Sequence, residues 1–123
     1  MAALRSYRLP TQPAYRQVAI QGKFVRSPSL SMKWIDSPDG SCRFCFLAKK
    51  KNGNAVYRNK CRRILRPLFF GAVPNIEKPV WAMVVVTDPA PLMTPARLRE
   101  SAMKIFRKMG WESQGETGDV GEG

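Results

Sequence analysis

The spacing of apolar residues along the chain predicts an alternation of helices and strands. Near the start, Tyr15, Val18 and Ala19 make a short helical stripe that Thr11 can cap and Gly22 can end. Residues 1–10 are basic and irregular, so a flexible arm is expected there.

Alternating apolar positions then indicate three strands. A short strand is expected over residues 24–26, a half-buried one over 30–35 and another over 42–48. The sequence Ser-Pro-Asp-Gly at 37–40 has strong turn chemistry. Residues 30–48 are therefore predicted to form a β-hairpin with a longer loop.

A second helix is predicted from about Ala55, because five apolar residues share one face at helical spacing. They are Tyr57, Cys61, Ile64, Leu65 and Leu68. Pro67 would cost about 3 kcal/mol inside a helix. The helix therefore either ends near Leu65 or bends so that residues 68–70 turn into the core. A loop is expected over residues 71–79.

The last two elements are a strand and a helix. Residues 80–87 are apolar in both alternating sets, which is typical of an interior strand covered on both faces. A helix follows between the capping Thr94 and the terminating Gly110, with Leu98, Ala102, Ile105 and Met109 on its core face. The predicted fold is an α+β two-layer sandwich of about four strands and three helices, in the order α-β-β-β-α-β-α.

The length and the charge distribution of the chain predict where its folded domain ends and what kind of partner it binds. We predict one domain over residues 1–111 and a disordered, acidic, Gly-rich tail over 112–123. The 21 basic and five acidic residues of 1–111 leave that domain a net charge of +16, against +12 for the whole chain. Such an excess indicates a polyanionic partner, and nucleic acid fits better than an anionic membrane. No basic amphipathic helix with lipid-facing aromatic residues is evident.

Residues 49–66, KKKNGNAVYRNKCRRILR, carry eight Lys or Arg and no acid. Opposite the apolar stripe of the helix lie Arg58, Asn59, Arg62, Arg63 and Arg66. Planar guanidinium groups along a rigid helix suit regularly spaced phosphates. An ordinary solvated face is the alternative, but such faces usually mix charges of both signs. We therefore predict a nucleic-acid-binding surface.

The same segment resembles the signature of the bacterial ribonuclease P protein family, G-N-A-V followed by R-N-R-x-K-R-x-x-R. The matching residues are Arg58, Asn59, Arg63 and Arg66. Lys60 and Arg62 are Arg/Lys exchanges, and the preceding lysines resemble the S-K-K of that family. The first helix is similar to its F-x-x-V-F pattern, from which Ala19 departs because the second aromatic residue is absent. Together with the element order, the resemblance spans about residues 4–110.

The resemblance implies a small α/β sandwich related to a ribosomal-protein domain. It also implies binding to the catalytic RNA of ribonuclease P and to the single-stranded 5′ leader of precursor tRNA, in a cleft between the sheet and the helices. Mg²⁺ ions held on the RNA would cleave the phosphodiester. We therefore expect no catalytic residue, metal site or cofactor on the protein itself.

The predicted RNA-binding residues are Arg58, Asn59, Lys60, Arg62, Arg63, Arg66, Lys49, Lys50, Lys51 and Asn54. Asn54 is also a common turn or cap residue, and the three lysines could be a solvated strand end. The leader cleft is predicted to contain Tyr15 and, depending on the register of the strand over 30–35, Lys33 or Trp34. Tyr15 could stack on a leader base or simply pack its helix on the sheet.

The remaining chemistry argues against catalysis by the protein. The chain has no histidine, which removes the usual general base and the Ser-His and Cys-His pairs. Cys42 and Cys45 form a C-x-x-C, but residues i and i+3 of a strand point to opposite faces and cannot share a metal. Two-metal cleavage needs clustered carboxylates, whereas the acids of residues 1–111 are scattered singly.

A structural RNA-binding protein of the ribosomal-protein type, without processing activity, would have the same composition. Only the signature at 53–66 separates the two functions. No apolar run is long enough for a membrane span and no signal peptide opens the chain. An odd number of cysteines favours reduced thiols. We expect a cytoplasmic protein with no membrane association that requires no protein partner.

Overall fold

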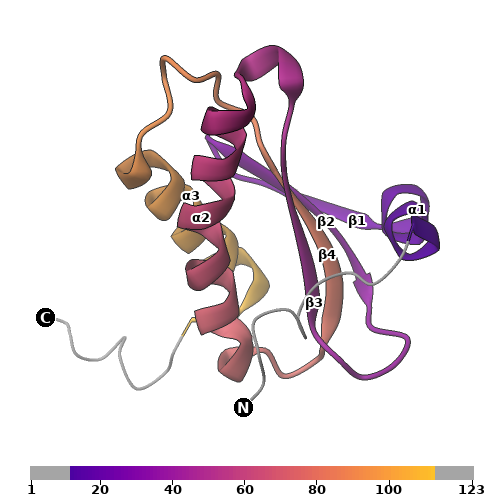
Figure 1. The fold of residues 1–123 in the computed structure, drawn as a ribbon. Helices are drawn as coiled ribbons and strands as arrows, with labels where there is room; N and C mark the ends of the chain where they lie inside the picture. Colours follow the sequence, from indigo (N-terminus) through magenta and orange to yellow (C-terminus); the bar gives the residue numbers. More distant parts are fainter. Residues whose placement is uncertain (1–11, 113–123) are drawn as a thin grey trace, which may run out of the picture.

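The computed structural model describes residues 12–112, and their elements follow the predicted order (Figure 1). The elements are α1 (Gln12–Gln21), β1 (Lys23–Arg26), β2 (Leu30–Asp36), β3 (Arg43–Ala48), α2 (Ala55–Ala72), β4 (Val80–Val86) and α3 (Pro95–Met109). The predicted arm, its neighbour Thr11 and residues 113–123 of the predicted tail lie outside the described residues.

Strand β4 lies inside a four-stranded sheet of order β1-β2-β4-β3. It pairs antiparallel with β2 over the whole of both strands and parallel with β3. The predicted β-hairpin over 30–48 is therefore wrong, because β4 separates β2 from β3. The apolar run of β4 explains this arrangement, since a central position covers both of its faces and pairs both of its edges.

Helices α2 and α3 cover one face of the sheet, and α1 lies on the other (Figure 1). The sandwich of a sheet and a helical layer was predicted, and α1 adds a second, smaller core. In β3, Phe44 and Phe46 point into the larger core under α2, while Cys45 contributes to the core under α1. This alternation confirms that Cys42, in the larger core, and Cys45 lie on opposite faces.

Helix α2 continues through Pro67 to Ala72, so the predicted end near Leu65 is wrong. The alternative in which the following residues enter the core is confirmed: Phe69 and Phe70 are buried, and the Phe69 ring lies 4.9 Å from that of Phe106 on α3. Burying two such rings, at about 1.5–3 kcal/mol each, offsets the roughly 3 kcal/mol cost of the proline. The predicted loop over 71–79 begins later, because a 3₁₀ turn (Val73–Asn75) follows the helix.

Helix α3 has the predicted ends. The Thr94 hydroxyl accepts a hydrogen bond from the backbone N–H of Arg97 at 3.1 Å. Gly110 adopts the left-handed conformation with φ of 76°, which glycine accommodates without steric cost. The chain then turns Trp111 into the larger core, beside Phe44 and Phe106. Among the described residues, no helix combines the length and apolar character needed to cross a membrane.

Candidate nucleic-acid interface

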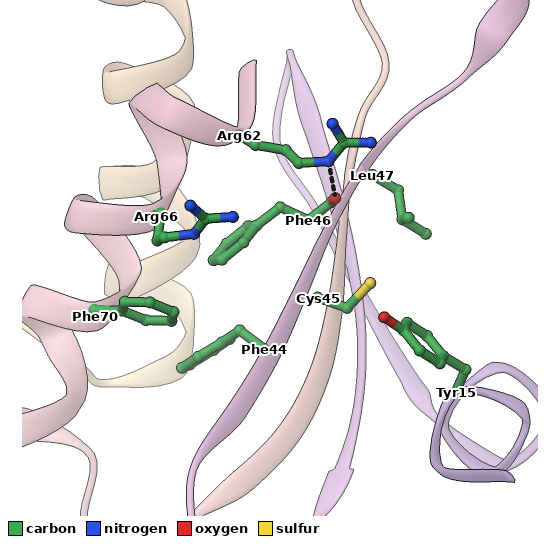
Figure 2. Close-up of a pocket in the computed structure, with 8 residues that line it drawn as sticks. All are labelled: Tyr15, Phe44, Cys45, Phe46, Leu47, Arg62, Arg66 and Phe70. Carbon is green, nitrogen blue, oxygen red and sulfur yellow. Dashed lines mark hydrogen bonds between the residues drawn. The ribbon is translucent and has the colours of Figure 1, made fainter. Parts of the chain in front are cut away.

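The basic residues of α2 fall into two sets. Arg58, Arg62 and Arg66 recur at intervals of four residues and are half-buried, whereas Lys60 and Arg63 are exposed. The Arg62 Nε donates to the backbone oxygen of Phe46 on β3 at 3.3 Å (Figure 2). The first set therefore turns toward the edge of the sheet, and the second faces solvent.

A cavity of about 320 Å³ lies along β3, the edge strand of the sheet (Figure 2). It is lined by Tyr15 from α1, by Phe44, Cys45, Phe46 and Leu47 from β3, and by Arg62, Arg66 and Phe70 from α2. Its walls thus combine aromatic rings with two guanidinium groups. This combination binds single-stranded nucleic acid well, because rings stack on bases and cations meet phosphates.

The cations of α2 have no acidic partner in the described part of the chain. The ion pairs found within residues 12–112 join Arg43 to Asp39, Arg97 to Asp88 and Arg107 to Glu112. Among these described residues, the acceptors that Arg62 contacts are both neutral, the Phe46 carbonyl and Asn59 Oδ1, the latter at 2.7 Å. The positive charge along α2 is therefore available to an external anion.

Tyr15 and Cys45 close the α1 side of the cavity. Burial raises the pKa of the Cys45 thiol, although a hydrogen bond with the Tyr15 side chain and the charge of Arg62 act in the opposite direction. Cys45 therefore stays a neutral thiol at physiological pH, and it forms part of the wall rather than a nucleophile. Tyr15 is half-buried, packs against the smaller core and also lines the cavity, so both sequence-based interpretations of it agree with its position.

Lys33 and Trp34 do not share one cleft with Tyr15. The Lys33 Nζ donates to the backbone oxygen of Ala19 at 2.8 Å, beneath α1. Trp34 packs on the larger core, and its ring lies 5.1 Å from the Nζ of Lys23. Adjacent residues of a strand point to opposite faces, so Lys33 lies on the α1 side of the sheet and Trp34 on the α2 side. Leader contact by either residue stays a prediction.

The segment before α2 combines a structural residue with exposed charge. Asn54 is the helix N-cap, and its Oδ1 accepts a hydrogen bond from the backbone N–H of Tyr57 at 3.0 Å. The cap interpretation of Asn54 is therefore confirmed, and RNA contact by this residue stays a prediction. Lys49, Lys50 and Lys51 are exposed at the end of β3 and in a 3₁₀ turn (Lys50–Asn52).

Sequence reasoning missed the role of β3 and Phe70 as walls of the cavity. The sequence showed the alternation along β3. The predicted hairpin paired this strand with β2, however, and so did not place β3 at the edge of the sheet beside β4. The described residues 12–112 also hold no group of three or more His, Cys, Asp or Glu side chains placed to bind a metal ion.

A family model described as Ribonuclease P matches residues 4–110. The chain belongs to the ribonuclease P protein family. The ribonuclease P protein component of Exiguobacterium sp. is 26% identical over 112 residues, which cover 90% of this chain and 97% of the relative. That of Gluconacetobacter diazotrophicus is 40% identical over 63 residues, covering 50% of this chain and 54% of the relative.

Solved ribonuclease P proteins share the fold. The Staphylococcus aureus RNase P protein superposes with a TM-score of 0.73 at 25% identity, over 85% of this chain and 97% of that one. The Thermotoga maritima protein has a TM-score of 0.70 at 19% identity, over 82% and 96%, which indicates likeness of fold alone. The family and the fold class predicted from the sequence are thereby confirmed.

Proposed function

We propose that this chain is the noncatalytic protein subunit of a ribonuclease P. It binds the catalytic RNA and the 5′ leader of precursor tRNA and assists endonucleolytic 5′ maturation. The observation that carries this proposal is the convergence on one cavity at a sheet edge of Tyr15 with Arg62 and Arg66, neither of which has an acidic partner within residues 12–112. A single strand fits such a site, because the site offers rings and cations together.

In this proposal the two sets of α2 cations bind different RNAs, the leader of precursor tRNA and the RNA subunit. Arg62 and Arg66 line the cavity, where they would hold leader phosphates. Lys60, Arg63 and the lysines 49–51 are exposed, and suit the phosphate backbone of the structured RNA subunit.

The placement of the acids supports a noncatalytic role. Asp88 is buried and bonded to Arg97, and Asp39 accepts hydrogen bonds from Ser37 and Ser41 within its own turn. Neither carboxylate is free to hold a catalytic metal beside the cavity. The Mg²⁺ ions needed for phosphodiester cleavage would therefore be held by the RNA subunit.

A salt titration tests RNA binding by α2. Arg63→Ala should lower the slope of log affinity for ribonuclease P RNA against log salt by roughly 0.7–0.9, which is the loss of one phosphate contact. Arg62→Ala should lower by the same amount the corresponding slope for leader-bearing precursor tRNA that binds to the assembled holoenzyme. Arg62→Ala should also cost about 0.5–1.5 kcal/mol of stability, because its bond to Phe46 is lost. Leu65→Ala should lower stability by about 2–5 kcal/mol and leave the slope unchanged.

The matched control is Arg99→Ala, which removes one positive charge from an exposed position on α3. The proposal would be contradicted by arginine variants of α2 that melt early while their salt slope equals that of the wild type. An unrelated structured RNA should bind more weakly. Equal affinity for both RNAs would favour a general structural RNA-binding protein.

A further inference from the structure

A second pocket, of about 350 Å³, lies on the face of the sheet that α2 and α3 cover. Lys23, Trp34 and Asp36 line it from the sheet, because Lys23 pairs directly with Trp34 and Asp36 follows two residues along β2, on the same face. Met109 and Trp111, at and just after the end of α3, also line this pocket. It is called the α3 pocket below, and it shares no lining residue with the cavity along β3.

Two carboxylates at the α3 pocket have no cationic partner within residues 12–112. Asp36 and Glu77 are exposed and line the pocket. The ion pairs of the described chain use Asp39, Asp88 and Glu112 instead. A carboxylate is an acceptor only, so the pocket suits a ligand that offers N–H or O–H donors.

Two lysines lie at the same pocket. Lys23 and Lys78 are exposed lining residues, and the Lys23 Nζ lies 5.1 Å from the centroid of the half-buried Trp34 ring. A cation over a ring at an exposed site contributes less than a base stacked on that ring, and the lysine stem is flexible. A base can therefore displace Lys23 from Trp34, which leaves the ammonium group to meet a phosphate.

An aromatic ring, open carboxylates and amines together match the parts of a guanine nucleotide. Guanine presents two adjacent donors, N1–H and N2–H₂, which one carboxylate can accept side by side. Adenine, cytosine and uracil each place an acceptor beside the donor on that edge, and a carboxylate repels an acceptor. Asp36 lies two residues from Trp34 along β2, about 6.8 Å away, so its carboxylate can reach the edge of a base stacked on that ring.

We propose that the α3 pocket binds a guanine nucleotide. Trp34 stacks on the base, Asp36 accepts from its N1–H and N2–H₂, and the two lysines bind the phosphate. Glu77, beside Lys78 in the chain, accepts from the ribose hydroxyls. The nucleotide is either free in solution or an unpaired guanosine of an RNA, since both present the same groups. The site goes beyond the proposed function and does not depend on leader binding.

Calorimetric titration of the full-length protein with GMP, AMP, CMP and UMP tests base recognition. At physiological ionic strength, charges more than about 8 Å apart are largely screened. The other three nucleotides carry the same phosphate as GMP, so they measure what the exposed cations of α2 bind without regard to the base. GMP should bind with a Kd below about 1 mM. It should bind about tenfold more tightly than the others, because a bidentate contact discriminates between bases to that extent.

Variants assign the parts of the nucleotide to residues. Asp36→Asn should lower the affinity for GMP about tenfold, to the level of AMP. Its matched control is Glu100→Gln, which removes an exposed carboxylate from α3 outside the pocket and should keep the preference for GMP. Lys78→Ala should weaken GMP and leave the affinity for guanosine, which has no phosphate, unchanged.

Two replacements of Trp34 separate stacking from packing. Trp34→Leu should weaken GMP about tenfold, whereas Trp34→Phe keeps a ring and should retain most of the affinity. Thermal melts check that each variant is folded. Because Trp34 also packs on the larger core, Asp36→Asn and Trp34→Phe keep the test decisive if Trp34→Leu does not fold.

The holoenzyme, assembled with ribonuclease P RNA, distinguishes the two sources of the nucleotide. If the guanosine belongs to the RNA subunit, the assembled complex should no longer bind GMP, and Asp36→Asn should weaken assembly about tenfold. If the nucleotide is free, the holoenzyme should bind GMP as the protein alone does. Either result supports the site.

The proposal is overturned if the four nucleotides bind equally, if GMP does not bind at millimolar concentration, or if Asp36→Asn keeps the preference for GMP. Retained GMP affinity in a folded Trp34→Leu protein, or its loss in a folded Trp34→Phe protein, overturns stacking on Trp34. The salt slopes that test RNA binding by α2 are separate measurements, so failure of this site leaves the proposed function in place.

Discussion

At the scale of single residues, Asp88 connects α2 and α3 to the end of β4, a role that no sequence pattern predicted. Its carboxylate accepts hydrogen bonds from Arg97 at 2.9 and 3.3 Å, and its backbone oxygen accepts one from the Tyr57 hydroxyl of α2. Burial by itself would raise the pKa of Asp88, but hydrogen bonds from Arg97 and Ser29 and the charge of Arg97 outweigh it and hold that pKa below its usual range. The ends of β4, α2 and α3 therefore meet at this residue.

Asp88→Asn should lower the free energy of unfolding at pH 7 by about 1.5–3 kcal/mol, the value of a hydrogen bond to a charged group. Because the folded-state pKa is depressed, this stabilisation is present above the ordinary pKa of 3.8 and is lost as the pH falls through the folded-state value. Denaturant unfolding between pH 2 and 7 should show the two proteins converging below about pH 4. A constant difference across that range would contradict the assignment.

The fate of Arg62 and Trp34 shows which residue positions the sequence could predict. Helical periodicity predicted Arg62 on one face with Asn59 and Arg63, whereas the structure leaves those two exposed and turns Arg62, half-buried, toward β3. Its bond to Phe46 could not be predicted, because it depends on β3 lying beside α2 at the edge of the sheet. Strand alternation predicts that Lys33 and Trp34 lie on opposite faces, but which of them faces α1 depends on how β2 packs in the folded sheet.

At the scale of elements, α2 is fixed at its start by Asn54 and near its end by Phe69 and Phe70. Its beginning and its apolar stripe were predictable from local chemistry. Its length was not, because Pro67 is unfavourable locally and only the aromatic core of the folded protein offsets it. The hairpin prediction failed for a similar reason. β4 pairs between β2 and β3 although it lies far along the chain from both, and a turn motif between those two strands does not indicate this.

Asn54→Ala should lower stability by about 0.5–2 kcal/mol, because the N–H of Tyr57 loses its acceptor. The salt slope for binding ribonuclease P RNA should stay at the wild-type value, since Asn54 carries no charge and neutralises no phosphate. Asn54→Ser keeps a capping oxygen and should recover most of the stability. Weaker RNA binding by Asn54→Ala at unchanged stability would instead make Asn54 an RNA contact.

At the scale of the whole molecule, the element order, the apolar central strand and the excess of positive charge were all predictable from the sequence. The family followed from a single segment, residues 53–66. The cavity was not predictable, since it forms where α1, β3 and α2 meet from three parts of the chain. In the proposed function, the charge and the fold together supply a surface for RNA, and the cavity supplies a site for a single strand.

The most direct test of this account is 5′ maturation of precursor tRNA by a bacterial ribonuclease P RNA at low Mg²⁺, with and without the purified protein. We predict that the protein alone cleaves nothing, that the RNA alone cleaves poorly, and that the two together restore specific cleavage. Joint replacement of Arg62 and Arg66 by alanine should reduce this restoration, and Arg99→Ala should not. Specific cleavage by the protein alone, or no gain when it joins the RNA, would contradict the account.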